Sequence, residues 1–279
     1  LGAEAKAVGQ WIVNYAMTNP EFRNSETWSN FVRADLPFQQ WTINFLNQNP
    51  NTTWTQFESW FITKTEGEDG EYIDNLDDIL SNIQYQTKPM PTYSQFVSAF
   101  PKLDYPGYPG YYKQMPAKDV YAIVKGNLLN SYNSSGGALN NKNPYRNACT
   151  VRFSLAMNRL GFMIPNNALS RAGANVNGVP WYYYLQAVTA GDFMQKTFGD
   201  PTHKLEGAAA NDSKTVTDFL KGKTGIYVIV NNNPKPTADG GAGYTGHVDL
   251  IQNSHVPGGS NHENVPGGIK SIRIWELNP

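Results

Sequence analysis

Cys149 is the residue with the clearest chemical potential, because it is the only cysteine among 279 residues. It lies in the segment NPYRNACTVRFSLAMNRLGFMIP, residues 143–165, after a polar stretch that contains a proline. Cys149, Phe153, Ala156 and Leu160 recur at helical spacing, a pattern that also suits a buried structural thiol. The polar stretch, however, is unlikely to be helical, so it predicts that Cys149 lies in the first turn of the helix. At a helix N-terminus, unpaired backbone N–H groups stabilise a thiolate and can hold an oxyanion, so the position favours a nucleophile.

A cysteine nucleophile needs a base, and the sequence offers four histidines. His203 lies in GDPTHKLEG, where we expect a surface loop, and His255 and His262 lie in the long loop NSHVPGGSNHENVPGG. His247 begins GHVDLIQ, which alternates as a strand does and follows a glycine-rich approach. A histidine at the start of such a strand can reach a helix N-terminus, so His247 is the candidate base.

The glycine-rich approach, GAGYTG at 241–246, matches the pattern of a dinucleotide-binding turn. That turn must follow a strand and open a helix, whereas this one precedes the strand pattern HVDLI. We therefore interpret the glycines as loop residues and expect no cofactor.

The elements that must position Cys149 and His247 divide the chain into two parts. Residues 1–86 are predicted to form a small helical domain with two repeat-like units, in which Trp11 and Phe31 recur as Trp41 and Phe57. The proline-rich segment QTKPMPT marks the boundary. Residues 87–279 show helices first and mainly strands after residue 180, so we predict an α+β domain with an antiparallel sheet.

Composition excludes several classes of function. The net charge is -1 and charged residues make up 16% of the chain, against about 25% in an average soluble protein. Nucleic-acid binding needs clustered basic charge, which is absent from the sequence. No apolar run approaches the ~20 residues of a membrane span, and no signal peptide is visible. A single cysteine allows no internal disulfide, so the redox compartment is left open.

The segments NACTVRFSLAMNRLGFMIP, GKTGIYVIV, GYTGHVDLI and IRIWEL, in this order, resemble the type VI secretion amidase effectors of the fourth family. The likeness covers about residues 88–279, and it is most specific at the cysteine helix and at G-H-x-D-L. It implies a papain-like fold of the NlpC cell-wall peptidase kind, with the cysteine helix at its start. It also implies a cysteine peptidase or amidase that cuts peptidoglycan stem peptides between D-glutamate and diaminopimelate. Such effectors are toxins that a secretion apparatus delivers to a rival bacterium's periplasm, where a cognate immunity protein blocks them.

The resemblance assigns Cys149 as the nucleophile and His247 as the general base, with an acidic third residue beyond the histidine. Asp249 is the first candidate because of the G-H-x-D-L match. Residues i and i+2 of a strand face the same side, about 6.6 Å apart, which is within reach but poorer than a side chain from a neighbouring strand. The rivals lie in the expanded loop that returns to the last strand, and they are Asn261, His262, Glu263 and Asn264. Asparagine suits this role too, because the residue need only accept the histidine's other N–H.

Two readings from other classes remain open. In a metal-dependent amidase, His247, Asp249, His255 and His262 would ligate zinc, but this reading leaves Cys149 unexplained. In a non-catalytic cell-surface binding module, aromatic and asparagine side chains such as those of WYYYL, residues 181–185, would line a groove, and Cys149 would be unreactive.

Overall fold

The computed structural model divides the chain into two compact units, one of Leu1–Lys64 with Lys102–Met115 and one of Thr65–Pro101 with Pro116–Pro279. It describes residues 2–25, 28–33, 36–48, 50–55, 57, 76–104, 112–137, 145, 148–235, 240, 242–257 and 265–279. The predicted domains, 1–86 and 87–279, remain a prediction about which parts fold independently.

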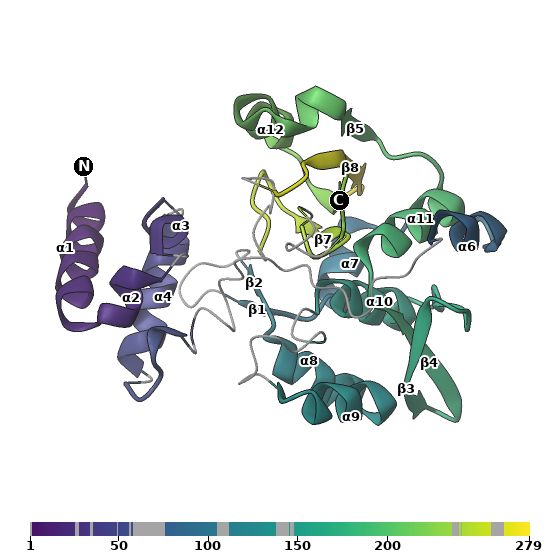
Figure 1. Ribbon diagram of the computed structural model, residues 1–279, viewed down its shortest axis with the longest axis horizontal. Helices are drawn as coiled ribbons and strands as arrows, with labels where there is room; N and C mark the ends of the chain where they lie inside the picture. The colour runs from purple at the N-terminus through teal and green to yellow at the C-terminus, as the bar shows by residue number, and fades with distance from the viewer. Residues whose placement is uncertain are drawn as a thin grey trace. The chain divides into compact units, whose positions relative to one another are not determined.

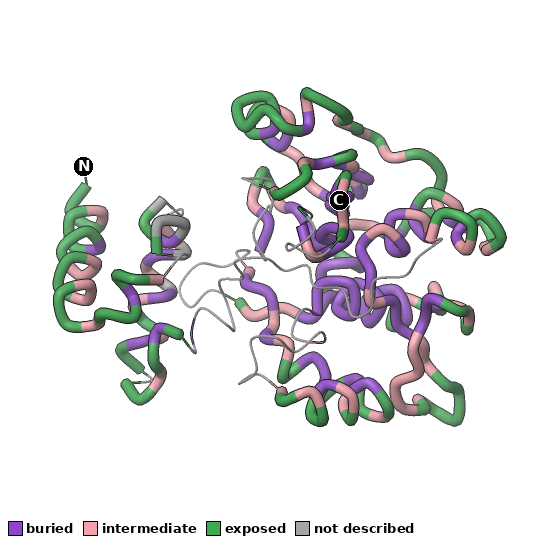
Figure 2. The backbone as a smooth tube through the Cα atoms, viewed as in Figure 1, coloured by how far each residue is buried: buried purple, intermediate pink, exposed green. Residues whose placement is uncertain are grey.

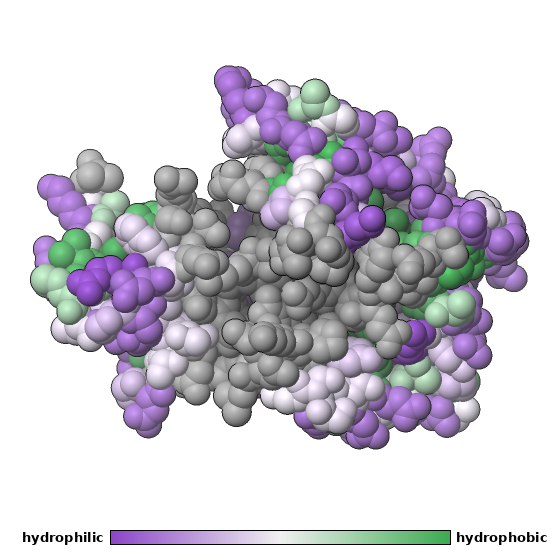
Figure 3. Space-filling view, viewed as in Figure 1, coloured by the Kyte–Doolittle hydropathy of each residue, from purple (hydrophilic) through white to green (hydrophobic). Residues whose placement is uncertain are grey.

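The first unit is a helical cluster with one short sheet. Its elements are α1 (Ala3–Thr18), α2 (Pro20–Asn24), α3 (Trp28–Arg33), α4 (Leu36–Gln48), and the antiparallel pair β1 (Lys102–Asp104) and β2 (Tyr112–Gln114). Aromatic side chains make the core, with the rings of Phe22 and Trp54 4.4 Å apart and both fully buried. Two apolar side chains of α1, Val13 and Met17, stay exposed, and apolar atoms lie among polar ones over this helix (Figure 3). Scattered exposure of this kind is ordinary and marks no site.

The second unit is α+β, as predicted, and its elements surround one four-stranded sheet (Figure 1). Its helices are α6 (Leu76–Asn82), α7 (Tyr93–Ala99), α8 (Ala117–Val124), α9 (Gly126–Ser134), α10 (Cys149–Arg159), α11 (Ala187–Phe198), α12 (Ser213–Leu220) and the 3-10 helix η2 (Gly207–Asn211). Its strands are β3 (Ser170–Val176), β4 (Val179–Tyr184), β5 (His203–Glu206), β6 (Gly225–Asn231), β7 (Gly246–Ile251) and β8 (Ile269–Glu276).

The sheet is antiparallel throughout, in the order β5-β8-β6-β7, so β7 is an edge strand among the described residues. Directly paired residues of antiparallel strands point to the same face. On one face, Tyr227 and Ile229 join an apolar cluster with residues of β8, α12 and η2. On the other face, α11 lies so close that a Cβ added to Gly191 would be 3.3 Å from Val228 Cγ1. Both faces are therefore covered, which explains the nearly continuous apolar run GIYVIVN of β6.

The sequence pattern of AKDVYAIVKGNLL favours a single helix, but the segment forms two, α8 and α9. The helix ends after Val124, where Lys125 and Gly126 take φ values of 58° and 60°. A Cβ at Gly126 would lie 2.5 Å from the carbonyl carbon of Gly173, so the break lets α9 approach β3 closely. Gly126 and Gly173 are 47 positions apart in the sequence, so no local sequence pattern predicts this contact.

Two strands also differ from expectation. The run WYYYL favours a strand, which is β4, but no pattern predicts its partner β3, although the turn between them, Asn177-Gly178, has the positive φ values and the residue types of a two-residue hairpin. His203, expected in a surface loop, begins β5, which pairs with β8, and its Nε2 lies 3.1 Å from Glu276 Oε2. That prediction was wrong because edge pairing with β8 organises a polar segment without strand periodicity.

Candidate active site

Cys149 is the first residue of α10, as the polar stretch before it predicted. The residue before it, Ala148, occupies the N-cap position and makes no side-chain cap hydrogen bond. Ser, Thr, Asp or Asn would normally satisfy a first-turn N–H from this position. The start of α10 therefore carries backbone donors that Ala148 does not cap, next to a thiol.

Helix α10 is buried along almost its whole length, and Figure 2 colours it accordingly. Three polar side chains fix it to neighbouring backbone. Ser154 Oγ accepts from Tyr184 N at 3.0 Å, Asn158 Nδ2 donates to Tyr182 O at 2.8 Å, and Arg159 Nη1 donates to Ala99 O at 2.8 Å. These bonds tie the middle and the C-terminal end of the cysteine helix to β4 and α7.

The thiol lies among buried groups. Cys149 is 1% exposed, and its Sγ is 3.5 Å from Thr150 Oγ1. Tyr121 of α8 is near it: burial raises the pKa of the Tyr121 phenol well above its usual value, the Arg152 charge opposes that shift, and Cys149 adds to it. Arg152 itself is 2% exposed, one turn after Cys149. No sequence pattern points to Tyr121 as a neighbour of the thiol, and Arg152 stands out only as a member of the cysteine segment.

His247 and Asp249 lie together on β7. The Nε2 atom of His247 is 3.5 Å from Asp249 Oδ2, and Asp249 Oδ1 accepts from the Leu250 N–H at 2.8 Å. Their side chains are 0% and 2% exposed. Because bulk water does not solvate this pair, a charge on either residue depends on its neighbours in the protein. Because His247 Nε2 faces Asp249 Oδ2 at 3.5 Å, the other ring nitrogen, Nδ1, is the one that can exchange a proton with another group.

The strand register fixes the direction of the pair. His247 is opposite Ile229 and Asp249 is opposite Tyr227, so both side chains share the face of those residues. The ring centroids of Tyr227 and His247 are 6.3 Å apart, which agrees with their lying on the same face of the sheet. Helix α10, which begins with Cys149, packs against β7, which carries His247 near its start. The two candidate residues therefore belong to adjacent elements of one unit.

The remaining candidates fall elsewhere. His255 is half-buried and exchanges backbone hydrogen bonds with Gln252 just beyond β7, while Asn261, His262, Glu263 and Asn264 lie outside the described residues. Among the described residues, no three His, Cys, Asp or Glu side chains are grouped as metal ligands would be. The alternative zinc site included His262, which lies outside the described residues, so that part of the zinc hypothesis is untested. In the same described part of the chain, no helix is long and apolar enough to cross a membrane.

The aromatic run on β4 serves mainly the core. Tyr183 and Tyr184 are 1% and 0% exposed, whereas Trp181 and Tyr182 are half-buried. Tyr184 exchanges a hydrogen bond of 2.9 Å with Tyr85, and burial raises the pKa of Tyr184 to about 12. Of the four aromatic residues, only Trp181 and Tyr182 retain surface that could line a groove.

Comparison with known proteins gives a consistent picture. Residues 145–275 match the family model of Tae4, described as "Type VI secretion system (T6SS), amidase effector protein 4". Among solved structures, the chain is similar to the type VI effector Tae4 from Enterobacter cloacae, with 15% identity, a TM-score of 0.49, and coverage of 69% of this chain and 100% of that one. It is also similar to Tae4 in an effector-immunity complex from Salmonella Typhimurium, with 21% identity, a TM-score of 0.47, and coverage of 68% and 99%. No curated protein matches the sequence.

Proposed function

We propose that the chain is a type VI secretion amidase effector of family 4, whose family model matches residues 145–275, and that it acts as a peptidoglycan amidase with a cysteine nucleophile. The observation that carries the mechanism is the position of Cys149 at the start of α10, where the side chain of the N-cap residue Ala148 caps no backbone N–H, on a helix packed against the strand of His247. The proposed target is the amide between D-glutamate and diaminopimelate in the stem peptide.

The proposed reaction is acyl transfer through a thioester. His247 Nδ1 takes the Cys149 proton, and the thiolate attacks the amide carbonyl carbon while backbone N–H groups at the start of α10 hold the oxyanion. His247 then gives the proton to the leaving amine, and the C–N bond breaks. A water molecule, deprotonated by His247, releases the acid and restores the thiol.

Asp249 has the proposed role of orienting His247. Its carboxylate is 3.5 Å from Nε2, so it stabilises the tautomer with the proton on Nε2 and the imidazolium that forms during turnover. Since Cys149 is 1% exposed, substrate binding must first uncover the thiol, so a conformational step precedes acylation. No metal or cofactor takes part in these steps.

The proposed setting is competition between bacteria. The solved Tae4 relatives include complexes with the immunity protein Tai4. By analogy, this chain is delivered to the periplasm of a target bacterium, and a cognate immunity protein covers its site. The proposed domain division assigns chemistry to a papain-like part within 87–279, and delivery or wall targeting to the helical part within 1–86.

One experiment separates the proposal from its alternatives. Purified muropeptides are incubated with the protein, with and without a thiol alkylator or a metal chelator, and the products are identified by mass spectrometry. The proposal expects cleavage at a single amide that the alkylator abolishes and the chelator leaves intact. Inhibition by the chelator alone would favour the zinc amidase, and intact muropeptides in every sample would favour the binding module.

A further inference from the structure

A pocket of about 390 Å³ lies at the end of the sheet where β6 ends and β7 begins. Thr245, in its wall, is two residues before His247, and its backbone oxygen accepts from Asn231 N at 2.9 Å. Two strand residues span about 6.6 Å, so the pocket wall at Thr245 lies near His247, which does not itself line the pocket. Its volume lies within the range of small-ligand sites.

The pocket wall includes a buried polar group that needs a donor. Asn231 is 3% exposed, and its Nδ2 donates to Tyr244 O at 3.0 Å, which fixes the orientation of the amide. Its Oδ1 is buried and has no hydrogen-bond partner in the part of the chain that the structure describes. Most buried acceptors in proteins have a hydrogen-bond partner, so this unsatisfied oxygen needs an explanation, such as a polar group that binds in the pocket.

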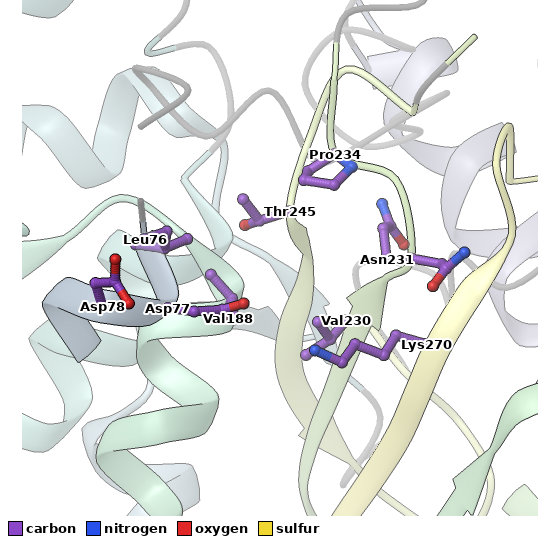
Figure 4. A pocket seen from close by; sticks show the side chains of 10 residues that line it. Leu76, Asp77, Asp78, Val188, Val230, Asn231, Pro234, Thr245 and Lys270 are labelled. Carbon is purple, nitrogen blue, oxygen red and sulfur yellow. The ribbon is translucent and has the colours of Figure 1, made fainter. Parts of the chain in front are cut away.

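Opposite charges face this pocket from different elements (Figure 4). Asp77 and Asp78 come from α6, and Lys270 comes from β8. All three side chains belong to exposed residues, and among the described residues none of them forms an ion pair. Val188 and Val230 supply apolar surface between the charges. The wall therefore suits a compact group with both an ammonium and a carboxylate.

The acidic side of the pocket comes from outside the segment that matches the family. Helix α6 is fixed to α11 by Lys196, whose Nζ donates to Leu80 O at 2.6 Å and to Ile83 O at 3.1 Å. A further bond joins Lys88 N to Thr197 O at 2.8 Å. These contacts hold Asp77 and Asp78 in position, so the pocket is a property of this chain and not of residues 145–275 alone.

We propose that this pocket binds a zwitterionic portion of the peptide substrate, with its ammonium against Asp77 and Asp78 and its carboxylate against Lys270. Asn231 Oδ1 accepts a hydrogen bond from a substrate N–H. The inference rests on the proposed function, because it assigns the pocket to the substrate of the neighbouring Cys149–His247 site. It makes residues 76–78 part of substrate recognition.

The test compares two synthetic stem peptides on the full chain: one has a free ammonium and a carboxylate beyond the scissile amide, and the other has that ammonium acetylated. With the zwitterionic peptide, the double variant Asp77→Asn, Asp78→Asn should raise KM about five- to tenfold and change kcat less than about twofold. With the acetylated peptide, wild type should already show the raised KM, and the variant should add nothing. Asp218→Asn, an exposed acid on α12 outside the pocket, is the matched control.

A second variant tests the opposite wall. Lys270→Gln should raise KM for the carboxylate peptide about five- to tenfold, and not for its carboxamide. Calorimetric binding of the same peptides separates recognition from turnover. Charge-dependent binding without cleavage would support the pocket and overturn the proposed amidase. Cleavage with a KM that neither acetylation nor these variants change would leave the amidase standing and overturn the pocket.

Discussion

Replacing Asp249 by asparagine tests the proposed orienting role with little change of shape. The variant keeps Oδ1, which accepts from the Leu250 N–H, and removes the charge that lies 3.5 Å from His247 Nε2. For unit charges at that distance, an effective dielectric constant of about 20 gives an attraction of about 4.7 kcal/mol, an upper bound. The separation exceeds the 2.7–3.2 Å of a good N–H···O bond, so the realised share is smaller.

We therefore expect Asp249→Asn to lower kcat/KM about 10- to 100-fold, which corresponds to about 1.4–2.8 kcal/mol of transition-state stabilisation. The assay is release of the amine product from a stem peptide, measured with variants matched in melting temperature. Asn261→Ala and Glu263→Ala are the comparison variants, because they represent the rival loop. Wild-type turnover in Asp249→Asn, with a large loss in either loop variant, would refute the role of Asp249.

Three further predictions concern the fold. Gly126→Ala should lower the free energy of unfolding by about 2–4 kcal/mol, because the φ of Gly126 is +60° and the added Cβ would meet backbone atoms. Gly161→Ala is the control, because Gly161 also has a positive φ but lies in open space, and it should cost about 1 kcal/mol. Equal losses for the two variants in urea titrations would contradict the prediction. A protein that begins at Leu76 should melt at a higher temperature than one that begins at Lys88, because only the longer one keeps α6 on α11; equal melting temperatures would show that α6 adds no stability. Burial raises the pKa of Asp192 against the opposing effect of Lys196, so the folded state binds the carboxyl proton more tightly than the unfolded state. Relative to Asp192→Asn, the wild-type protein should therefore lose stability as pH rises from about 4 through the folded pKa. A difference in urea midpoints that stays constant over this pH range would refute the prediction.

The parts of the fold that sequence predicts well are those with strong local patterns. The apolar run of β6, the alternation after His247 and the polar stretch before Cys149 each specify an element, and the structure has all three. Buried strands and helix starts depend on neighbouring residues in sequence, so a single chain reveals them.

Long-range contacts decide the rest. The break at Gly126 depends on Gly173, and the strand at His203 depends on pairing with β8. The pocket joins Asp77 to Lys270 across almost the whole second unit. The proximity of Tyr121 to Cys149 likewise joins two helices. No local period encodes such pairings, because tertiary packing sets them.

Intact-protein mass spectrometry after acid quenching shows whether Cys149 forms a thioester with the peptide it cuts. With stem peptide and wild-type protein, we expect an adduct with the mass of the acyl half, located on the proteolytic fragment that contains Cys149. We also expect release of the matching amine, and the absence of both in Cys149→Ala, which keeps its melting temperature. Release of the amine by Cys149→Ala at the wild-type rate would show that Cys149 is not the nucleophile.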